Sequence, residues 1–341
     1  MKKILPLLIV AGFLLSAPAD AWSQARDIKW GTAAVGSTGH RALTVLASVL
    51  NREMPNYRVA VLPLPGAILT MKGYATGDLD AYYGADIGFY ELANDINRFK
   101  GFKAQIKRQL VQSFWLYTVE VGVGIHARDR DKYRKWRDLS GEPVFTGPLP
   151  WDVRAHLERA FGVLGVKHRY VNVDLTTAGS LLEKGDIKAF ITYTNAEAGT
   201  APWIIEASLG TDWAILNPNP EELDLLRKAG FRTVEVRPEV FKRNVYVDKV
   251  LYLPFYYGFH VGLEVPDEDA YKMLTVIEKN VAELAKASSD FEQIRTDMPG
   301  MQRKGVESSI DLVPIHPGLA RYMRERGVWD PKWNDRVAKR Q

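Results

Sequence analysis

Glycine, serine and threonine gather in the loop "GTAAVGST", residues 31–38, directly ahead of a segment with helical hydrophobic periodicity. Such a loop offers free backbone N–H groups and short hydroxyls, and the helix dipole favours negative charge beside it. The chemistry it suits is the binding of an anion: a nucleotide phosphate, a reacting oxyanion or a carried solute. Ser37 and Thr38 also have a purely structural role open to them, because either hydroxyl can cap the helix.

Neither common nucleotide motif fits this loop. A phosphate-binding loop needs Lys directly after its second Gly, but Ser37 follows Gly36 here. The dinucleotide fingerprint needs Gly-x-Gly-x-x-Gly, and Gly31, Gly36 and Gly39 are spaced differently. The sequence therefore argues against a nucleotide.

The sequence also lacks a catalytic constellation. A nucleophile elbow would need Gly where Val35 stands, two residues before Ser37. The chain has six histidines and no cysteine, and it contains no His-Glu-x-x-His motif. We therefore expect no catalytic residue, no metal and no cofactor, and we expect that the chain is not an enzyme.

A carried solute requires more than one loop. A single helix N-terminus contributes about 0.3–2 kcal/mol to binding an anion, whereas micromolar affinity needs about 8 kcal/mol. A second candidate loop, "TGPLPWD" at 146–152, also precedes a helical pattern. Trp151 in it could cover a ligand, and Arg154 could hold a carboxylate with both nitrogens or pair with a surface acid instead.

The elements that position these loops occur in two similar halves. The phrases "TGDLDAYYG" (76–84) and "KGDIKAFIT" (184–192) each read as a helix ended by Gly and followed by a buried strand. Strands that alternate with helices predict mainly parallel sheets, and hence two α/β lobes. The β-rich runs 114–128 and 250–265 are long enough to cross between the lobes as a hinge. The groove between the lobes, beyond the carboxyl ends of the strands, is then the expected site.

The first residues predict export. Lys2 and Lys3 precede an apolar run, residues 4–15, and small residues follow up to Ala25. This pattern is typical of a signal peptide cleaved after Ala21 or Ala25, and the apolar run is too short for a membrane span. We expect a protein free in the periplasm. The predicted organisation is a signal peptide at 1–25, a first lobe at 26–115, a second lobe with the hinge crossings at 116–234, and a return to the first lobe with C-terminal helices at 235–341.

Charge and composition narrow the class further. The formal net charge of the 341 residues is only +4, and the basic stretch 128–138 is interleaved with aspartates. An exported chain with so modest a charge is a poor nucleic-acid binder. Because there are no disulfides, stability must come from the core, which a chain of this length can supply.

Five segments together resemble the substrate-binding subunits of TRAP transporters of the TAXI family. They span nearly the whole mature chain and read "IKWGTAAVGSTGHRALTVLASVLN" (28–51), "PGAILTMKGYATGDLDAYYGAD" (65–86), "KWRDLSGEPVFTG" (135–147), "EKGDIKAFITYTNA" (183–196) and "LVPIHPGLARYMRERGVW" (312–329). The last is the most specific, because His-Pro-Gly before an Arg-Tyr helix closes many family members. The resemblance implies a two-lobed, type II-like periplasmic binding protein fold with mainly parallel sheets.

The resemblance also implies a function. Members bind a small acid, such as glutamate, glutamine or 2-oxoglutarate, and deliver it to integral-membrane TRAP permease subunits driven by an ion gradient. The chain departs from the family at Pro65-Gly66-Ala67, where Gly-Gly-Ser is usual, and at "TGPLPWDV", which replaces a Gly-Ser-Gly-Thr loop. The second loop is stiffer and more aromatic, which favours a bulkier or partly aromatic acid.

The hypothesis is therefore a monomeric periplasmic receptor for a small organic acid or amino acid. A receptor for an ATP-driven importer, a sensor module and an enzyme on the same scaffold remain alternatives. The residues expected to bind the ligand are Val35, Gly36, Ser37, Thr38, Gly66 and Ala67 from the first lobe, and Thr146, Gly147, Trp151, Arg154, Tyr193 and Thr194 from the second.

Overall fold

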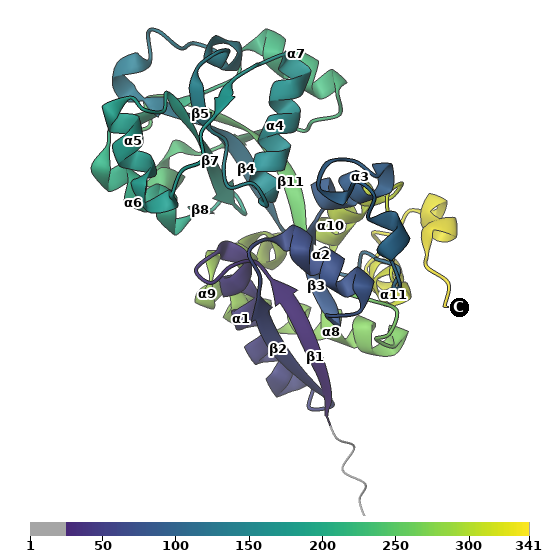
Figure 1. Cartoon of the computed structure of the whole chain (residues 1–341). Helices are drawn as coiled ribbons and strands as arrows, with labels where there is room; N and C mark the ends of the chain where they lie inside the picture. Colours follow the sequence, from purple (N-terminus) through teal and green to yellow (C-terminus); the bar gives the residue numbers. More distant parts are fainter. Residues whose placement is uncertain (1–24, 341) are drawn as a thin grey trace, which may run out of the picture.

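Strands and helices alternate through the first segment of the chain, as the sequence predicts (Figure 1). The computed structural model describes residues 25–340. The predicted signal peptide and its cleavage sites thus lie outside the described residues, except for Ala25. The elements of this first segment are β1 (Arg26–Thr32), α1 (Thr38–Glu53), β2 (Tyr57–Pro63), α2 (Ala67–Thr76), β3 (Ala81–Ala85), α3 (Asp86–Asn94), η1 (Asn97–Phe99) and η2 (Lys103–Gln105).

The second lobe follows a long strand, β4, that runs out of the first lobe. Its elements are β4 (Trp115–His126), η3 (Ala127–Asp129), η4 (Trp136–Leu139), β5 (Pro143–Phe145), α4 (Asp152–Leu164), β6 (Arg169–Tyr170), η5 (Leu175–Thr177), α5 (Ala178–Lys184), β7 (Ala189–Asn195), β8 (Gly199–Thr200), α6 (Pro202–Gly210), β9 (Trp213–Leu216), α7 (Pro220–Lys228), β10 (Val234–Val236) and η6 (Pro238–Phe241).

The chain then returns along a second long strand, β11, to a set of helices that pack on the first lobe. These elements are β11 (Val250–Val261), α8 (Asp267–Lys279), α9 (Val281–Ala287), η7 (Ser289–Phe291), α10 (Glu292–Ser309), α11 (Pro317–Glu325) and η8 (Pro331–Arg336). Because β10 pairs with the start of β11 and η6 contacts β8, residues 234–250 still lie with the second lobe. The crossing back to the first lobe takes place within β11.

The strands form one continuous path through both lobes, in the order β2-β1-β3-β11-β4-β7-β5-β6. Within each lobe the pairs β1–β2, β1–β3, β5–β6 and β5–β7 are parallel. The long strands β4 and β11 pair antiparallel with each other, and they also join β7 and β3 antiparallel. The expected α/β architecture of two lobes is thus confirmed, with two crossing strands between them (Figure 1).

The internal repeat has a structural counterpart. Gly77 and Gly185 end α2 and α5 in the left-handed conformation, and each is followed by a fully buried strand. Leu79 and Ile187, which occupy equivalent places in the two phrases, both donate their backbone N–H to a carbonyl of the preceding helix. The same local turn therefore starts β3 in one lobe and β7 in the other.

Burial explains why these elements form. Helix α1 buries one face, with Leu43, Leu46, Val49 and Leu50 against the sheet, as its periodicity predicts. The central strand β4 is buried along its whole length, as expected for a strand between two lobes. No helix within residues 25–340 is long and apolar enough to cross a membrane.

Candidate ligand-binding cleft between the lobes

A cleft of about 360 Å³ lies between the lobes, against the crossing strands. Four helices begin at it: α1 and α2 from the first lobe, and α4 and α6 from the second. Eight of the twelve residues that the sequence singles out line it. They are Val35, Gly36, Ser37, Thr38, Gly66, Ala67, Trp151 and Tyr193.

The loop before α1 is shaped by a capping turn. Ser37 accepts a hydrogen bond on Oγ from the N–H of His40 at 3.2 Å, so its capping role is real. This leaves the N–H groups of Thr38 and Gly39, which have no carbonyl four residues earlier within the helix. Gly36 lies before them with φ +83° and open space where a Cβ would be. Capping and ligand contact are therefore compatible in this loop.

The loop before α2 touches the second lobe. Gly66 caps α2 without any side-chain hydrogen bond, so the N–H groups of Ala67 and Ile68 face the cleft end of the helix. A Cβ at Gly66 would come within 3.1 Å of the carbonyl oxygen of Pro150. A bare backbone is therefore required where the two lobes approach each other.

Helix α4 begins at a carboxylate that links the lobes. Asp152 is fully buried; Arg98 of the first lobe donates to it at 2.6 Å, and Tyr257 on β11 donates to it at 2.7 Å. Arg98 also donates to Glu91 at 2.7 Å and to the carbonyl of Pro150 at 3.2 Å. This hydrogen-bonded set joins α3, α4 and the hinge strand at the edge of the cleft.

Aromatic rings form much of the remaining wall. The rings of Tyr83 and Tyr257 stack with centroids 4.5 Å apart and an interplanar angle of 9°. The indole N–H of Trp203 donates to the hydroxyl of Tyr193 at 2.9 Å, and the hydroxyl of Tyr83 is hydrogen-bonded to that of Tyr117. Because these polar groups are satisfied internally, the cleft meets ring faces and edges.

The sequence analysis missed Asn195. Its side-chain nitrogen lines the cleft, is buried and has no hydrogen-bond partner among residues 25–340. Thr194, predicted instead, points to the other face of β7 and donates to Glu120 at 2.5 Å. Side chains alternate along a strand, so Tyr193 and Asn195 share the cleft face and Thr194 cannot. The alternation of side chains along a strand would by itself have selected Tyr193 and Asn195 together.

Three other predicted residues lie outside the cleft. Thr146 is buried and donates to Glu158 at 2.5 Å, and the carbonyl of Gly147 accepts from Tyr170 at 3.1 Å. Arg154 lies 3.3 Å from Glu158 and stacks over the ring of Tyr170 at 4.4 Å. The surface-acid alternative for Arg154 is therefore the one observed.

The charge of the lining is unusual for an anion site. Within the part of the chain that the structure describes, no lysine or arginine lines the cleft, and its acids are Asp152, which is already paired, and Glu206. A bound anion would rely on backbone N–H groups and on the amide of Asn195. Across residues 25–340 no three His, Cys, Asp or Glu side chains are grouped to hold a metal ion.

Comparisons with known proteins concern the fold. No protein-family model matches the chain, and no curated protein matches it in sequence. Among similar solved structures, the periplasmic aliphatic sulphonate binding protein SsuA from Escherichia coli shares 14% identity over 92% of this chain and 97% of that chain, with a TM-score of 0.40. The probable amino-acid ABC transporter extracellular-binding protein ytmK from Bacillus subtilis shares 11% over 79% and 99%, with a TM-score of 0.45.

A third similar structure, described as a putative L-cystine ABC transporter from Listeria monocytogenes, shares 11% identity over 79% of this chain and 97% of that chain, with a TM-score of 0.45. The fold class is the mixed α/β, type II-like periplasmic binding protein fold expected from the sequence, and the strand order described above carries this assignment. Identities this low leave the ligand of this chain open.

Proposed function

We propose that the chain is a periplasmic solute-binding receptor of a transport system. It captures a small organic acid or amino acid with an apolar or aromatic body between its lobes and presents it to membrane permease subunits. The observation that carries the proposal is the convergence of the N-termini of α1, α2, α4 and α6 on one cleft whose other walls are mainly aromatic and aliphatic. Helix N-termini favour anions, and apolar walls favour an apolar body.

The energetics require both parts of the ligand. Each helix end adds about 0.3–2 kcal/mol, so four of them can fall short of the roughly 8 kcal/mol that micromolar affinity needs. An aromatic ring that buries about 150 Å² adds about 4 kcal/mol at ~25 cal/mol per Å². A monoacid with an aromatic body therefore uses this cleft better than a small aliphatic acid does.

A second carboxylate on the ligand would be poorly served. It would meet the rings of Tyr83, Trp151 or Trp203, with no lysine or arginine in the lining to pair with it. An unpaired charge taken from water costs several kcal/mol. We therefore expect monoacids to bind more tightly than glutamate or 2-oxoglutarate.

The transport system we propose is of the TRAP type, with the chain as its TAXI-like receptor. Support comes from the resemblance of the five segments named above, including the C-terminal "HPGLARY". A receptor for an ATP-driven importer is the main alternative. Neighbouring genes separate them, because fused membrane permease genes accompany the first and an ATPase gene accompanies the second.

A thermal-shift panel tests the ligand class. Phenylacetate, phenylalanine, glutamate and 2-oxoglutarate would each be added to the mature chain. At 100 times Kd a ligand stabilises the fold by about 2.7 kcal/mol, and we expect the two aromatic acids to raise Tm most. If glutamate or 2-oxoglutarate gave the larger shift, the preference for an apolar body would be wrong. Turnover of any panel member would contradict the receptor function.

A further inference from the structure

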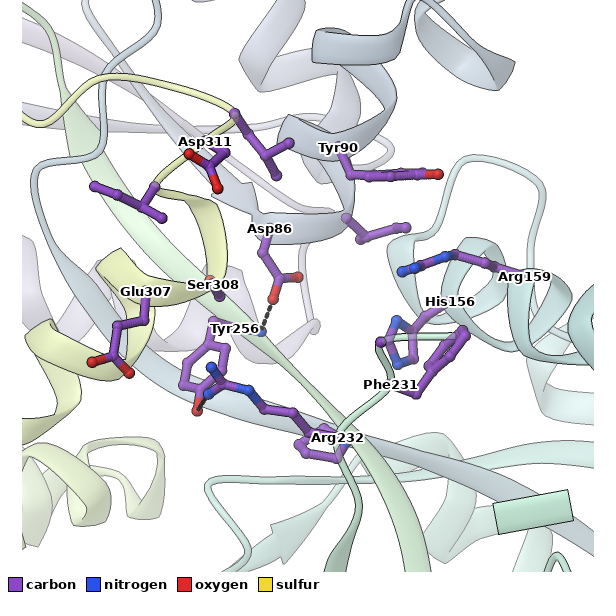
Figure 2. A pocket seen from close by; sticks show the side chains of 15 residues that line it. Asp86, Tyr90, His156, Arg159, Phe231, Arg232, Tyr256, Glu307, Ser308 and Asp311 are labelled. Carbon is purple, nitrogen blue, oxygen red and sulfur yellow. Dashed lines mark hydrogen bonds between the residues drawn. The ribbon is translucent and has the colours of Figure 1, made fainter. Parts of the chain in front are cut away.

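A second cavity of about 360 Å³ lies on the other face of the hinge strand from the cleft. Tyr257 on β11 lines the cleft, whereas its neighbours Pro254 and Tyr256 line this cavity. Along α4 the start of the helix faces the cleft, and His156 and Arg159 face the cavity. Both lobes and the hinge strand contribute to its walls (Figure 2).

Two arginines face this cavity without acidic partners. The guanidinium of Arg159 lies between the rings of Tyr90 and Phe231, 4.7 and 4.5 Å from their centroids. Arg232 donates to the hydroxyl of Tyr256 at 2.8 Å. Within the part of the chain that the structure describes, neither guanidinium has a carboxylate oxygen within 4.0 Å.

Two of the three acids of the cavity, in contrast, are already paired with arginines outside it. Glu307 lies 3.0 Å from Arg303, and Asp311 lies 2.6 Å from Arg336. Asp86 accepts the backbone N–H of Tyr256 at 3.1 Å, drawn as a dashed line in Figure 2. Among residues 25–340 Asp86 has no basic partner within 4.0 Å, and burial raises its pKa to about 7, so the two arginines outweigh it and the net charge of the cavity is positive.

A buried histidine adds an unused donor. His156 is 5% exposed, and neither of its ring nitrogens has a hydrogen-bond partner among the described residues. Burial lowers the pKa of His156 to about 3, so the ring is neutral near pH 7 and carries one N–H. Figure 2 shows the ring beside Phe231 and Arg159 at the cavity wall. A buried donor without a partner costs about 1–3 kcal/mol, which a bound acceptor would recover.

We propose that this rear cavity is a second binding site, for a small oxyanion of the carboxylate or phosphate class, held by Arg159, Arg232 and His156. Two guanidiniums and an imidazole N–H are the donors that oxyanions take most readily. Arg159 and His156 belong to the second lobe, and the wall opposite belongs to α3 and α10 of the first. An occupant therefore contacts both lobes, and its affinity is linked to the state of the cleft.

Calorimetric titration of the mature chain tests this site. Inorganic phosphate and acetate serve as the two probes, at an ionic strength matched with chloride. We expect saturable binding of at least one probe, which also separates a phosphate site from a carboxylate site. Arg159→Gln and Arg232→Gln should each raise the Kd about tenfold or more, as expected for loss of a charge-assisted hydrogen bond. The matched control is Arg169→Gln, an exposed arginine on β6 of the same lobe, which should leave the Kd unchanged.

Two results would overturn the second site. One is the absence of binding by both probes at concentrations up to about 10 mM, where any Kd below about 1 mM would register. The other is binding that both glutamine variants leave unaltered. Arg232 is exposed, so its variant tests the site even if Arg159→Gln unfolds the chain. This proposal and the cleft function fail separately, because a cleft variant such as Gly36→Val that no longer binds the panel acid should still bind the probe.

Discussion

The two cavities on either face of the hinge strand have similar volumes and opposite chemistry. The cleft has the N-termini of α1, α2, α4 and α6, and among residues 25–340 it has an unpartnered amide at Asn195 and no basic side chain in its lining. Among residues 25–340, the rear cavity has two guanidiniums without a carboxylate partner, and two of its three acids are paired with arginines. On one face the groups suited to bind an anion are backbone N–H groups at helix N-termini, and on the other they are charged arginine side chains. The front arrangement suits a ligand with an apolar body, because its walls are mainly aromatic and aliphatic and its acids are Asp152, which is already paired, and Glu206.

Neighbouring residues on β4 and on β7 likewise point to opposite faces of the sheet. Val119, Tyr193 and Asn195 face the cleft, whereas Glu120 and Thr194 face away. A shift of one residue along either strand would turn Glu120 or Thr194 toward the cleft in place of Val119, Tyr193 and Asn195. The following changes test how independent the two faces are, beginning with the largest expected effect.

The largest effect is expected at the buried contact that joins the lobes at the edge of the cleft. Asp152→Ala removes the acceptor of Arg98 and Tyr257 and leaves a largely buried guanidinium with Glu91 alone. We expect the free energy of unfolding, measured by urea titration, to fall by about 3 kcal/mol. The loss is large because the remaining charge stays buried without its partner and without water to replace it. Asp311→Ala, which removes an exposed ion pair, should cost less than about 1 kcal/mol. Equal losses in the two variants would show that Asp152 does not join the lobes.

A smaller effect is expected at neighbouring residues on opposite faces of β7. Asn195→Ala should weaken binding of the best panel acid about tenfold, because one hydrogen bond to a charged group is lost. Thr194→Val removes the hydroxyl that serves Glu120, so it should lower stability by about 1 kcal/mol and leave the Kd within about twofold. Ligand titration followed by the fluorescence of Trp151 and Trp203, which lie in the cleft, measures the Kd of both variants, and urea titration measures their stability. The reverse pattern would place the ligand on the other face.

The smallest effect concerns pH and the rear-facing carboxyl of Glu120. Burial raises its pKa from 4.5 to about 8, despite the hydroxyls of Thr118 and Thr194 that donate to it. A group whose pKa is raised on folding contributes stability that is full below its unfolded pKa and is lost as pH rises through its folded pKa. Unfolding free energy should therefore fall by about 1 kcal/mol between pH 7 and 9.

Glu120→Gln provides the control for this pH effect. The amide is isosteric and does not titrate, so the decline between pH 7 and 9 should disappear while the cleft Kd stays constant. Persistence of the decline in the variant would assign it to another group.

The sequence predicted the loops and helix starts of the site because these are set locally. Ser37 caps α1, Gly66 precedes α2 and Trp151 precedes α4, each within a few residues of the element it starts. Thr194 and Arg154 do not line the cleft, because their side-chain direction is set by register and by neighbouring packing. The resemblance to a receptor family implied a glutamate-like ligand, whereas the aromatic wall depends on residues from both lobes and the hinge.

The rear cavity lies beyond any local pattern. Arg159 and Arg232 belong to different elements, and the rings that flank Arg159 come from α3 and from the segment before β10. Only the tertiary fold shows that these arginines lack acids while two of the three acids nearby are paired with other arginines. Sequence charge runs do not report such pairing.

The most direct test of the central claim uses two glycines in the same backbone conformation. Gly36 and Gly101 both have positive φ and open space at the Cβ position, so valine strains each by a similar amount. Gly36 lines the cleft ahead of α1, and Gly101 does not. Titration with the best panel acid should show binding abolished in Gly36→Val and retained in Gly101→Val. Equal affinity in both variants would contradict the claim that the helix N-termini of the cleft hold the ligand.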